Sequence, residues 1–364
     1  MVENYMRKIL LSALLVTVGA CVVVVAQTQK QKTLDIYSID VEGGKATLFV
    51  APSGETMLTD AGIPGPRDSG RIIAAVKSLG IKQIDYMLVT HFDADHVGGV
   101  AEVAAQVPMR NFVDHGSIVV TAERAVAVFN NYAAVRDKGH HILAKPGDKV
   151  PIAGLDVEIV TAGGEAVKKP LPGGGAPNPL CRDFTPGEDD KTEDPNSVGV
   201  VIRYGRFKAL DLGDLTWNKE HDLVCPNNPL GTVDLYLTTR HGLNGAGAPV
   251  IVHAVRPRVA VMNNGPRKGA SREAFTTIKS SPGLEDLWQL HYSVARPASP
   301  AANVHETSPT GGPELNTSEQ MIANMDEAAD HASVYTIKVS AREDGSFVVT
   351  NTRNGFSKEY KARR

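Results

Sequence analysis

The feature that most constrains this chain is the run Thr90-His91-Phe92-Asp93-Ala94-Asp95-His96-Val97-Gly98-Gly99, which follows an apolar, strand-like segment from Tyr86 to Val89. Four of its residues carry imidazole or carboxylate groups: His91, Asp93, Asp95 and His96. Such groups are the usual ligands of catalytic zinc, manganese and iron. Ligands that alternate along an extended loop can point at one centre, whereas the adjacent Asp95 and His96 are expected to face different metals. The run therefore predicts a metal site rather than an ordinary solvated turn.

This run resembles the His-x-His-x-Asp-His signature of the metallo-β-lactamase superfamily. Asp93 stands where most members carry the second histidine, a variant associated with some phosphodiesterase-like branches. The resemblance implies an α/β fold, the αββα sandwich of the metallo-β-lactamase type, with two bound divalent metal ions. Zinc is the first expectation. Because Asp93 makes one site richer in oxygen, manganese or iron is the alternative.

The stretch from Ile39 to Val50, followed by Met57 to Gly62, is similar to the opening of the metallo-hydrolase domain of the ComEC competence proteins. Those proteins commonly carry an Asp-Val-Gly-Gln-Gly-Asp-Ala run, which this chain alters at Glu42, Gly43 and Lys45. The likeness is to the branch, and it implies two opening strands that place Asp60 beneath the metal loop. Asp60 is expected to accept a hydrogen bond that orients a ligand, rather than to bind the metal itself.

The apolar segments 198–204 and 207–214 predict a β-hairpin that turns at Gly205-Arg206. In the superfamily, an aspartate at the end of the corresponding strand bridges the two metals. The resemblance assigns this role to Asp214 at the strand end, rather than to Asp211 inside the strand.

Two further histidines complete the ligand set that the resemblance implies. The strand-like segment 233–241 ends on His241, which matches the last ligand of the superfamily. His115 follows a short apolar strand and is assigned as the third histidine of the first site. The alternative for His115 is a strand-end histidine or a residue that faces the substrate.

The chemistry expected of such a site is hydrolysis. Two divalent ions bridged by Asp214 lower the pKa of a shared water, so a metal-bound hydroxide is the expected nucleophile. Asp95 is the expected catalytic residue, because it can hydrogen-bond the nucleophile while holding its metal. The sequence shows no Gly-x-Ser-x-Gly elbow, P-loop or dinucleotide-binding glycine fingerprint.

We therefore predict a metal-dependent hydrolase that acts on a phosphodiester or phosphoester. One alternative is a hydrolase of β-lactam or lactone type, which opens an amide or ester. The alternative from another class is a metal-bound or degenerate binding module on the cell surface.

The amino terminus has the pattern of a secretory signal peptide at 1–26, because Arg7 and Lys8 precede an apolar run that ends at Ala26. Cleavage there predicts an exported protein, periplasmic or extracellular. The alternatives are an uncleaved membrane anchor at 9–26 and a lipoprotein signal at Cys21.

If Cys21 leaves with the signal, the mature chain retains Cys181 and Cys225. An even pair in an oxidising compartment predicts a disulfide, and the alternative is two unpaired buried thiols. The bond would tie a Pro/Gly-rich insert at 166–196 to the loop after Asp214.

Residues 33–364 are predicted to form one hydrolase domain, because the metal motifs span most of this length. Helices are expected at 72–79 and 121–135 between strands, which suits a layered α/β fold. The segments 334–340 and 346–350 predict a hairpin around Asp344-Gly345.

A formal net charge of −3 gives no sign of a basic face for long nucleic acids. We expect a small-molecule substrate, no stable nucleic-acid complex, and membrane contact only through an uncleaved signal. The acidic run at 188–194 is interpreted as a solvated loop. Three cations are candidates for reading an anionic group: Arg240, Arg267 and Lys268. The sequence makes no prediction of the oligomeric state.

Overall fold

The computed structural model describes residues 32–297, 310–328 and 334–363. Residues Thr33–Arg364 form one compact unit, separate from Met1–Lys32. The predicted signal segment at 1–26, with its cleavage site and Cys21, lies outside the described residues. Within the described ranges, no helix combines the length and the apolar character that crossing a membrane requires.

Among the described residues, nine strands form the first sheet, in the order β20-β19-β18-β1-β2-β3-β4-β5-β6. The strands from β3 to β6 are parallel neighbours, whereas the remaining neighbours are antiparallel. Their bounds are β1 (Leu34–Ser38), β2 (Thr47–Val50), β3 (Thr56–Thr59), β4 (Ile84–Leu88), β5 (Met109–Asp114), β6 (His140–Leu143), β18 (Ile337–Ala341), β19 (Phe347–Asn351) and β20 (Ser357–Tyr360).

The second sheet also has nine described strands, in the order β17-β16-β15-β14-β12-β11-β8-β7, with β9 paired to β8. Here the strands from β12 to β17 are parallel neighbours. Their bounds are β7 (Lys149–Val150), β8 (Asp156–Ala162), β9 (Glu165–Ala166), β11 (Gly199–Tyr204), β12 (Phe207–Asp211), β14 (Leu235–Leu237), β15 (Val259–Met262), β16 (Asp286–His291) and β17 (Ile322–Asn324).

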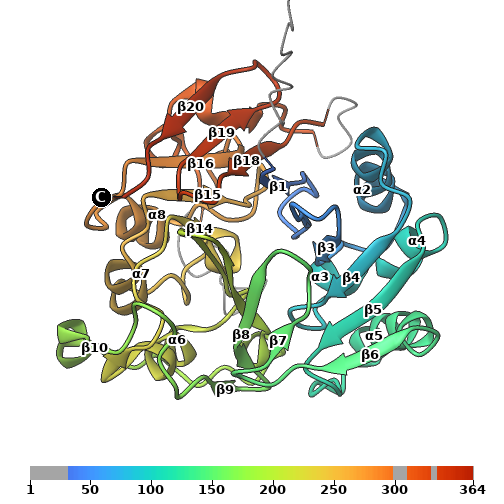
Figure 1. Ribbon diagram of the computed structural model, residues 1–364, viewed down its shortest axis with the longest axis horizontal. Helices are drawn as coiled ribbons and strands as arrows, with labels where there is room; N and C mark the ends of the chain where they lie inside the picture. The colour runs from blue at the N-terminus through green and yellow to red at the C-terminus, as the bar shows by residue number, and fades with distance from the viewer. Residues whose placement is uncertain (1–31, 298–309, 329–333, 364) are drawn as a thin grey trace, which may run out of the picture. The chain divides into compact units, whose positions relative to one another are not determined.

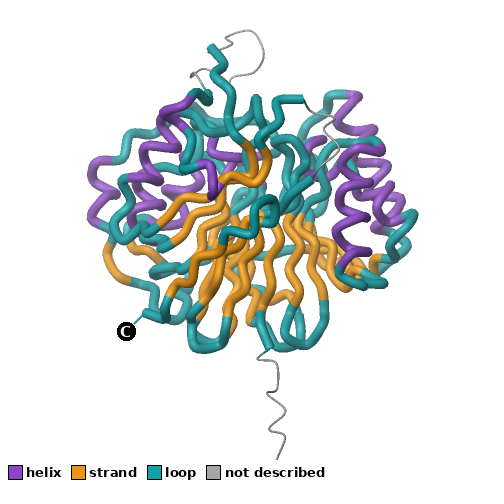
Figure 2. Tube along the Cα trace, turned by 90° about the horizontal axis from the view of Figure 1, so that it is seen from above, coloured by secondary structure: helices purple, strands orange, loops and turns teal. Residues whose placement is uncertain are grey.

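Helices cover the outer face of each sheet, so the strands occupy the middle of Figure 2 with helices on both flanks. The helices beside the first sheet (Figure 1) are α2 (Pro66–Ser78), α3 (Ala94–Val97), α4 (Val100–Ala104) and α5 (Glu123–Arg136). Those beside the second sheet are α6 (Trp217–Val224), α7 (Pro249–Val255) and α8 (Arg272–Lys279). Short 3₁₀ helices lie at Pro179–Asp183, Asp194–Asn196, Thr239–Gly242, Pro313–Leu315 and Glu319–Met321.

Three buried apolar clusters correspond to the three boundaries between these layers. The largest fills the space between the sheets and includes Trp288 and Phe347. A second packs α6, α7 and α8 against the second sheet, and a third packs the helices from α2 to α5 against the first. Burial of apolar surface on both faces of each sheet holds the layers together. The predicted αββα sandwich is confirmed.

Several predicted elements are confirmed, with shifted ends. The hairpin before Asp214 forms as β11 and β12, and the C-terminal hairpin forms as β18 and β19, to which β20 adds an unpredicted third strand. Helix α2 begins six residues before the predicted start, because Pro66 is tolerated in a first helical turn. The helix predicted at 121–135 forms as α5.

The prediction of the opening strands is wrong in its bounds. The first strand, β1, ends at Ser38, and the motif residues that follow form a loop before β2. Glu42 has a φ of 56°, which a strand does not tolerate, and its backbone N–H donates to the Asp40 carboxylate. The loop places Lys45 beneath the metal motif, where its backbone N–H donates to Asp95 at 3.0 Å.

The insert at 166–196 lies against the chain that follows Asp214. The short strands β10 (Ala176–Pro177) and β13 (Asn227–Asn228) pair with each other. A disulfide joins Cys181 to Cys225, with 5.8 Å between their Cα atoms. The insert is therefore attached at its middle as well as at its ends.

Candidate metal centre

The metal motif begins where β4 leaves the first sheet. Because β3 and β4 are parallel, Asp60 and Thr90 emerge side by side at the same sheet edge. The chain then enters α3, whose N-cap residue is Asp93 and which carries Asp95 and His96. His96 is fully buried, whereas the Asp93 side chain keeps 42% of its surface exposed. The motif therefore runs from the interior to the opening of the site.

Asp95, His96 and His241 form one compact cluster, which we call the second ligand group. The adjacent Asp95 and His96 therefore share one cluster, contrary to the expectation that they face different metals. Asp95 Oδ2 lies 3.4 Å from His96 Nε2 and 3.3 Å from His241 Nε2. The two imidazole nitrogens are 3.2 Å apart. His241 follows β14, so this group joins the carboxyl ends of strands from both sheets.

Asp214 lies beside this group. Its Oδ1 is 3.4 Å from His96 Nε2 and its Oδ2 is 3.2 Å from His241 Nε2. It also clusters with His91 and His96. Glycine at position 213 allows the chain to place Asp214 here. The φ of Gly213 is 59°, and a Cβ at this residue would lie 2.7 Å from Thr90 Cβ.

Asp211, the competitor of Asp214, has a different partner. It forms a fully buried ion pair with Lys45 and belongs to none of the ligand clusters among the described residues. Lys45 is one of the residues that depart from the ComEC-like run. No pattern in the chain predicts its pairing with a residue 166 positions away.

His91, Asp93 and Asp194 form a further cluster, which we call the first ligand group. His91 Nε2 lies 3.3 Å from Asp194 Oδ1 and 4.0 Å from Asp93 Oδ2. Asp194 belongs to the acidic run that the sequence placed in a solvated loop, yet it is 4% exposed. That interpretation is wrong for Asp194 and for the buried Glu193.

A signal for Asp194 was present in the sequence. It closely precedes β11, whose amino end lies beside the carboxyl end of its antiparallel neighbour β12. Residues before β11 and after β12 therefore meet at one sheet edge. Applied to the predicted hairpin, this rule would have brought Asp194 near Asp214.

His115 does not join either ligand group. Its Nε2 lies 3.2 Å from Glu193 Oε2, and its ring packs 4.4 Å from that of Phe92. Glu193 also accepts the backbone N–H groups of Val119 and Val120. His115 thus contacts the residue next to Asp194 and anchors the end of the insert.

Hydrogen bonds hold the ligand imidazoles in orientation. His96 Nδ1 lies 2.8 Å from Asp60 Oδ2, and Asp60 also accepts from the Thr90 amide and hydroxyl, each at 2.8 Å. On the other side, Asn263 Nδ2 lies 3.1 Å from His241 Nδ1. Partners of this kind leave the opposite ring nitrogen directed at the centre.

The imidazoles and carboxylates of the cluster shift one another's pKa values. Burial alone would lower the pKa of His96, but Asp214, Asp95 and Asp60 raise it well above the ordinary value. Burial opposes ionisation of Asp95 too, yet Lys268 and His96 hold the pKa of its carboxyl well below the usual range. Partial burial raises the pKa of Asp93 to about 6, and the carboxylate of Asp194 adds to this rise.

The donor set fits divalent metal ions. Two of its buried atoms, His91 Nε2 and Asp214 Oδ1, have no hydrogen-bond partner among the described residues. Buried polar atoms are normally satisfied, so orphaned ligand atoms that face one centre indicate a missing partner. Imidazole nitrogen and carboxylate oxygen bind zinc, manganese and iron.

Of the three predicted anion-reading cations, one lies at the opening of the site. Lys268 Nζ is 2.5 Å from Asp95 Oδ2, and 32% of its side chain is exposed. Arg240 is buried and contacts Asp194 and Asp190. Arg267 pairs with Glu327 on the surface.

Two other groups of ligand-type residues lie elsewhere in the described chain. Asp40, Glu42 and His291 cluster together, but Arg71 already supplies a cation to both carboxylates. Cys181, His221 and Cys225 also cluster, but the cysteines are bonded to each other. Neither group has the open carboxylate and imidazole set of the metal motif.

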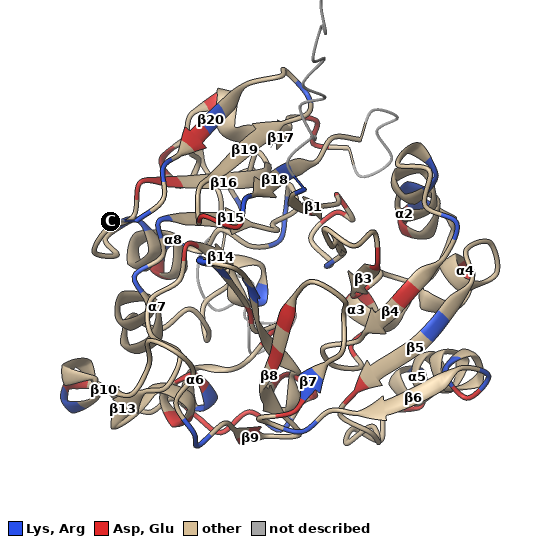
Figure 3. Ribbon diagram, viewed as in Figure 1, with Lys and Arg blue, Asp and Glu red and all other residues tan. Residues whose placement is uncertain are grey.

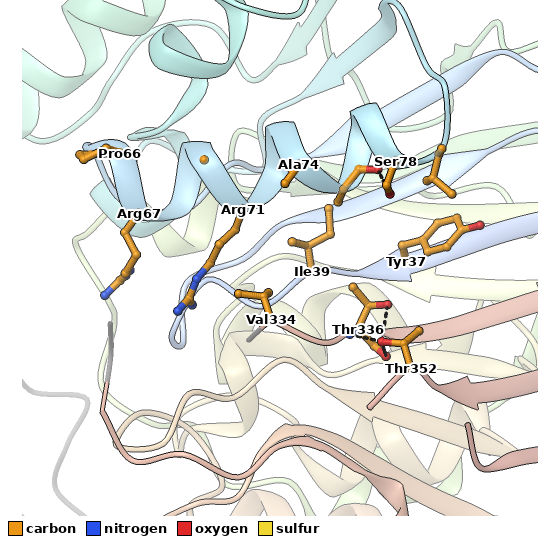
Figure 4. A pocket seen from close by; sticks show the side chains of 13 residues that line it. Tyr37, Ile39, Pro66, Arg67, Arg71, Ala74, Ser78, Val334, Thr336 and Thr352 are labelled. Atoms are coloured by element: carbon orange, nitrogen blue, oxygen red, sulfur yellow. Dashed lines mark hydrogen bonds between the residues drawn. The ribbon is translucent and has the colours of Figure 1, made fainter. Parts of the chain in front are cut away.

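A cavity of about 790 Å³ lies apart from the ligand groups, between α2, β1 and the residues just before β18 and just after β19. Figure 4 shows Tyr37 and Ile39 facing the helix across this space, with Arg67 and Arg71 near its other end. None of the candidate ligands lines it. A second cavity, of about 700 Å³, is bordered by Arg240, Trp217 and the acidic run.

Comparison with known families agrees with this architecture. Residues 40–179 match the model of the metallo-beta-lactamase superfamily. The chain has the metallo-β-lactamase fold. The matched range contains the metal motif but ends before Asp194, Asp214 and His241, so their convergence is known from the structure alone. No curated protein matches the chain.

Three solved structures illustrate the range of similar chains. A metallo-β-lactamase with a HARLDQ motif from Cronobacter sakazakii is 15% identical, with 56% of this chain and 73% of that chain covered and a TM-score of 0.34. The metallo-β-lactamase fold protein YhfI from Bacillus subtilis is 10% identical, with 71% and 96% covered and a TM-score of 0.43. CmlA, a diiron β-hydroxylase from Streptomyces venezuelae, is 13% identical, with 70% and 48% covered and a TM-score of 0.39.

Proposed function

We propose that this protein is an exported, binuclear metal-dependent hydrolase of the ComEC-like branch that acts on a phosphodiester or phosphoester. The observation that carries the proposal is the convergence of two ligand groups on either side of Asp214. Residues from 91 to 241, from both sheets and from the insert, contribute to them. A binding module has no need for two adjacent clusters of this kind.

In this proposal, His91, Asp93 and Asp194 hold the first metal, and Asp95, His96 and His241 hold the second. Asp214 would offer its carboxylate to both, because it clusters with His91 of the first group and His96 of the second, and Asp194 would take the place that the resemblance assigned to His115. With Asp194, the first position has carboxylates for most of its ligands, which favours manganese or iron over zinc. The second position is richer in imidazole and suits zinc. Metal analysis of protein prepared without added ions tests this assignment.

Bound divalent ions would lower the pKa of a shared water and polarise the oxygen under attack. The remaining work falls to the chain itself. Asp95 directs one carboxylate oxygen at the centre, and Asp60 and Asn263 fix the imidazoles of His96 and His241. Burial of the two imidazoles and of Asp60 and Asn263 keeps these side chains in place before substrate arrives.

The charge at the opening supports an anionic substrate. Two divalent cations would balance the carboxylates of Asp93, Asp95, Asp194 and Asp214. Lys268, which neutralises Asp95 in the structure, would then be available to a phosphoryl oxygen of the substrate. Figure 3 shows acidic and basic residues interspersed on the helices of both flanks, a pattern that suits a small substrate better than a long nucleic acid.

The second candidate function is opening of a lactone or β-lactam ring, because the same centre can activate water against an acyl carbon. Purified protein should be assayed with bis-p-nitrophenyl phosphate, nitrocefin and a simple lactone, with and without a chelator. Chelator-sensitive turnover of the phosphodiester alone supports the proposal. Turnover of only the other substrates contradicts its substrate class, and no turnover together with absent metal favours a binding module.

Export rests on the signal pattern at 1–26 and is supported by the Cys181–Cys225 disulfide, because such bonds persist in oxidising compartments. Residues 33–364 would then act as a single domain, without a stable nucleic-acid partner. Mass spectrometry of the mature protein tests this. A chain that begins at Gln27 supports cleavage, whereas a retained Met1 favours the membrane anchor.

A further inference from the structure

The backbone between β14 and α7 takes an unusual path at Arg240 and His241. Their φ angles are 51° and 55°, and Gly242 follows at 76°. Residues with a side chain rarely adopt this left-handed conformation, and such strain is retained where the surrounding structure uses it. Here His241 belongs to the second ligand group, whereas Arg240 contacts Asp194 of the first. Two adjacent residues therefore contact the two ligand groups.

The Arg240 guanidinium lies between two carboxylates of the insert. Its Nη2 contacts Asp194 Oδ2 and lies 3.3 Å from Asp190 Oδ2. The Arg240 side chain is 3% exposed, and those of Asp194 and Asp190 are 5% and 10% exposed. Asp190 also accepts the amide and hydroxyl of Thr192, at 2.8 Å and 2.6 Å. The segment 190–194 therefore wraps around one buried cation.

The two oxygens of Asp194 have different surroundings. Oδ2 faces Arg240, whereas Oδ1 lies 3.3 Å from His91 Nε2. The backbone next to it is anchored separately, because Glu193 accepts the amides of Val119 and Val120. Position and orientation thus have distinct sources, since Glu193 fixes where the segment lies and Arg240 fixes which way the Asp194 carboxylate turns.

We propose that Arg240 is a positioning residue that holds Asp194 as an oxygen ligand of the first metal and so couples the insert to the metal centre. This inference rests on the proposed binuclear site. Without the guanidinium, Asp190 and Asp194 would face each other as like charges, and Asp194 would turn from His91. Arginine suits this task because its planar group spans two carboxylates, which the point charge of lysine does less well.

The test measures metal binding directly, by calorimetric titration of the metal-free full-length protein with Mn²⁺ or Zn²⁺ alone. Arg240→Met should weaken one of two binding events by about 10–100-fold and leave the other unchanged. Arg240→Lys should recover part of the loss. Arg203→Met is the matched control, because Arg203 is also a largely buried guanidinium shared by two carboxylates, Asp156 and Glu158. It should retain both events.

A double-mutant cycle separates positioning from a merely structural role. If Arg240 acts through Asp194, then Asp194→Asn should lose the same binding event, and Arg240→Met should add little to it. Additive losses, or equal losses in the Arg240 and Arg203 variants, overturn the inference. So does an Arg240→Met protein that binds both metals with normal affinity. If the unaltered protein binds no metal, the proposed function itself fails.

Discussion

The two ligand groups are built in different ways. The second group consists of His96 and Asp95 on α3 and of His241 in the short 3₁₀ segment that directly follows β14, so every member belongs to or adjoins a regular element of the sandwich. The first group takes His91 and Asp93 from the motif but Asp194 from the insert. Of the ligand imidazoles, only those of the second group are hydrogen-bonded to Asp60 and Asn263. One position is thus supported by the packed core, and the other depends on a loop.

Because of this difference, substitutions in the two groups are expected to have different effects. Under the proposed function, changes to the second group would disturb residues buried in the core, whereas changes in the insert would alter the first metal position and leave the sheets intact. Ligands on regular elements are held more rigidly than ligands on loops. The first position is therefore where metal preference is expected to vary, and the second where it is expected to stay fixed.

The largest effect is expected for His96, which contacts Asp60, Asp214 and His241. His96→Ala should reduce hydrolysis by about 10³-fold or more, because the metal contributes several kcal/mol of charge stabilisation and about 1.4 kcal/mol corresponds to a tenfold change in rate. Steady-state rates and metal content measure this. His140→Ala, which alters an exposed imidazole on β6, is the control. A His96→Ala protein with normal turnover contradicts the site.

The attachment of the insert can be broken at its disulfide. The bond closes a span of 44 residues, so the Cys181→Ala/Cys225→Ala protein should lose about 4 kcal/mol of unfolding free energy. It should also lose the first metal more readily than the second, because the sheets that carry the second group are untouched. Urea unfolding and metal retention measure the two effects. Equal loss of both metals would remove the contrast between the groups.

Glu220 provides a pH-dependent test on the side of the second group. It is fully buried on α6 and accepts the amides of Gly247 and Ala248, each at 2.8 Å, which fixes the chain between His241 and α7. Burial raises the pKa of Glu220 from 4.5 to about 7, although these amides favour its charged form.

The folded state therefore binds this proton more tightly than the unfolded state. As pH rises from about 4.5 to about 7, Glu220 should lower the unfolding free energy by on the order of 3 kcal/mol. Glu220→Gln should flatten this dependence, as measured by urea unfolding across the range. An unchanged slope in the variant would show that other groups cause it.

The smallest effect is expected for the metal preference of the first position. Asp93→His replaces an oxygen ligand by nitrogen and should raise the ratio of zinc to manganese affinity by about tenfold, or about 1.4 kcal/mol. Competitive titration with the two metals measures this ratio. The corresponding change at the second position, Asp95→His, should reduce binding of either metal. If both variants shift preference alike, the two positions do not differ as described.

Features that depend on residues close together in the chain could be predicted from the sequence. Spacing within 91–96 predicted the metal motif. Two apolar segments around Gly205-Arg206 predicted the hairpin β11–β12, and alternation with turn residues predicted the hairpin β18–β19. Asp214 was preferred to Asp211 from its place at the end of the strand, and these two residues do have different partners. Such inferences succeed because backbone geometry relates a local pattern directly to side-chain direction.

Contacts between residues far apart in the chain became known from the tertiary structure. Asp194, assigned to a solvated loop, is buried against His91, and His115, assigned to the metal, faces Glu193 instead. Lys45 pairs with Asp211, which lies 166 positions away in the chain, and Lys268 pairs with Asp95, which lies 173 positions away. Hairpin geometry could have placed Asp194 near Asp214, but no local pattern encodes the other pairs, because they follow from the packing of two sheets and an insert around one edge. Burial then determines the pairing. A charge removed from water is costly unless it is paired, so each buried charge contacts an opposite charge that the fold brings near.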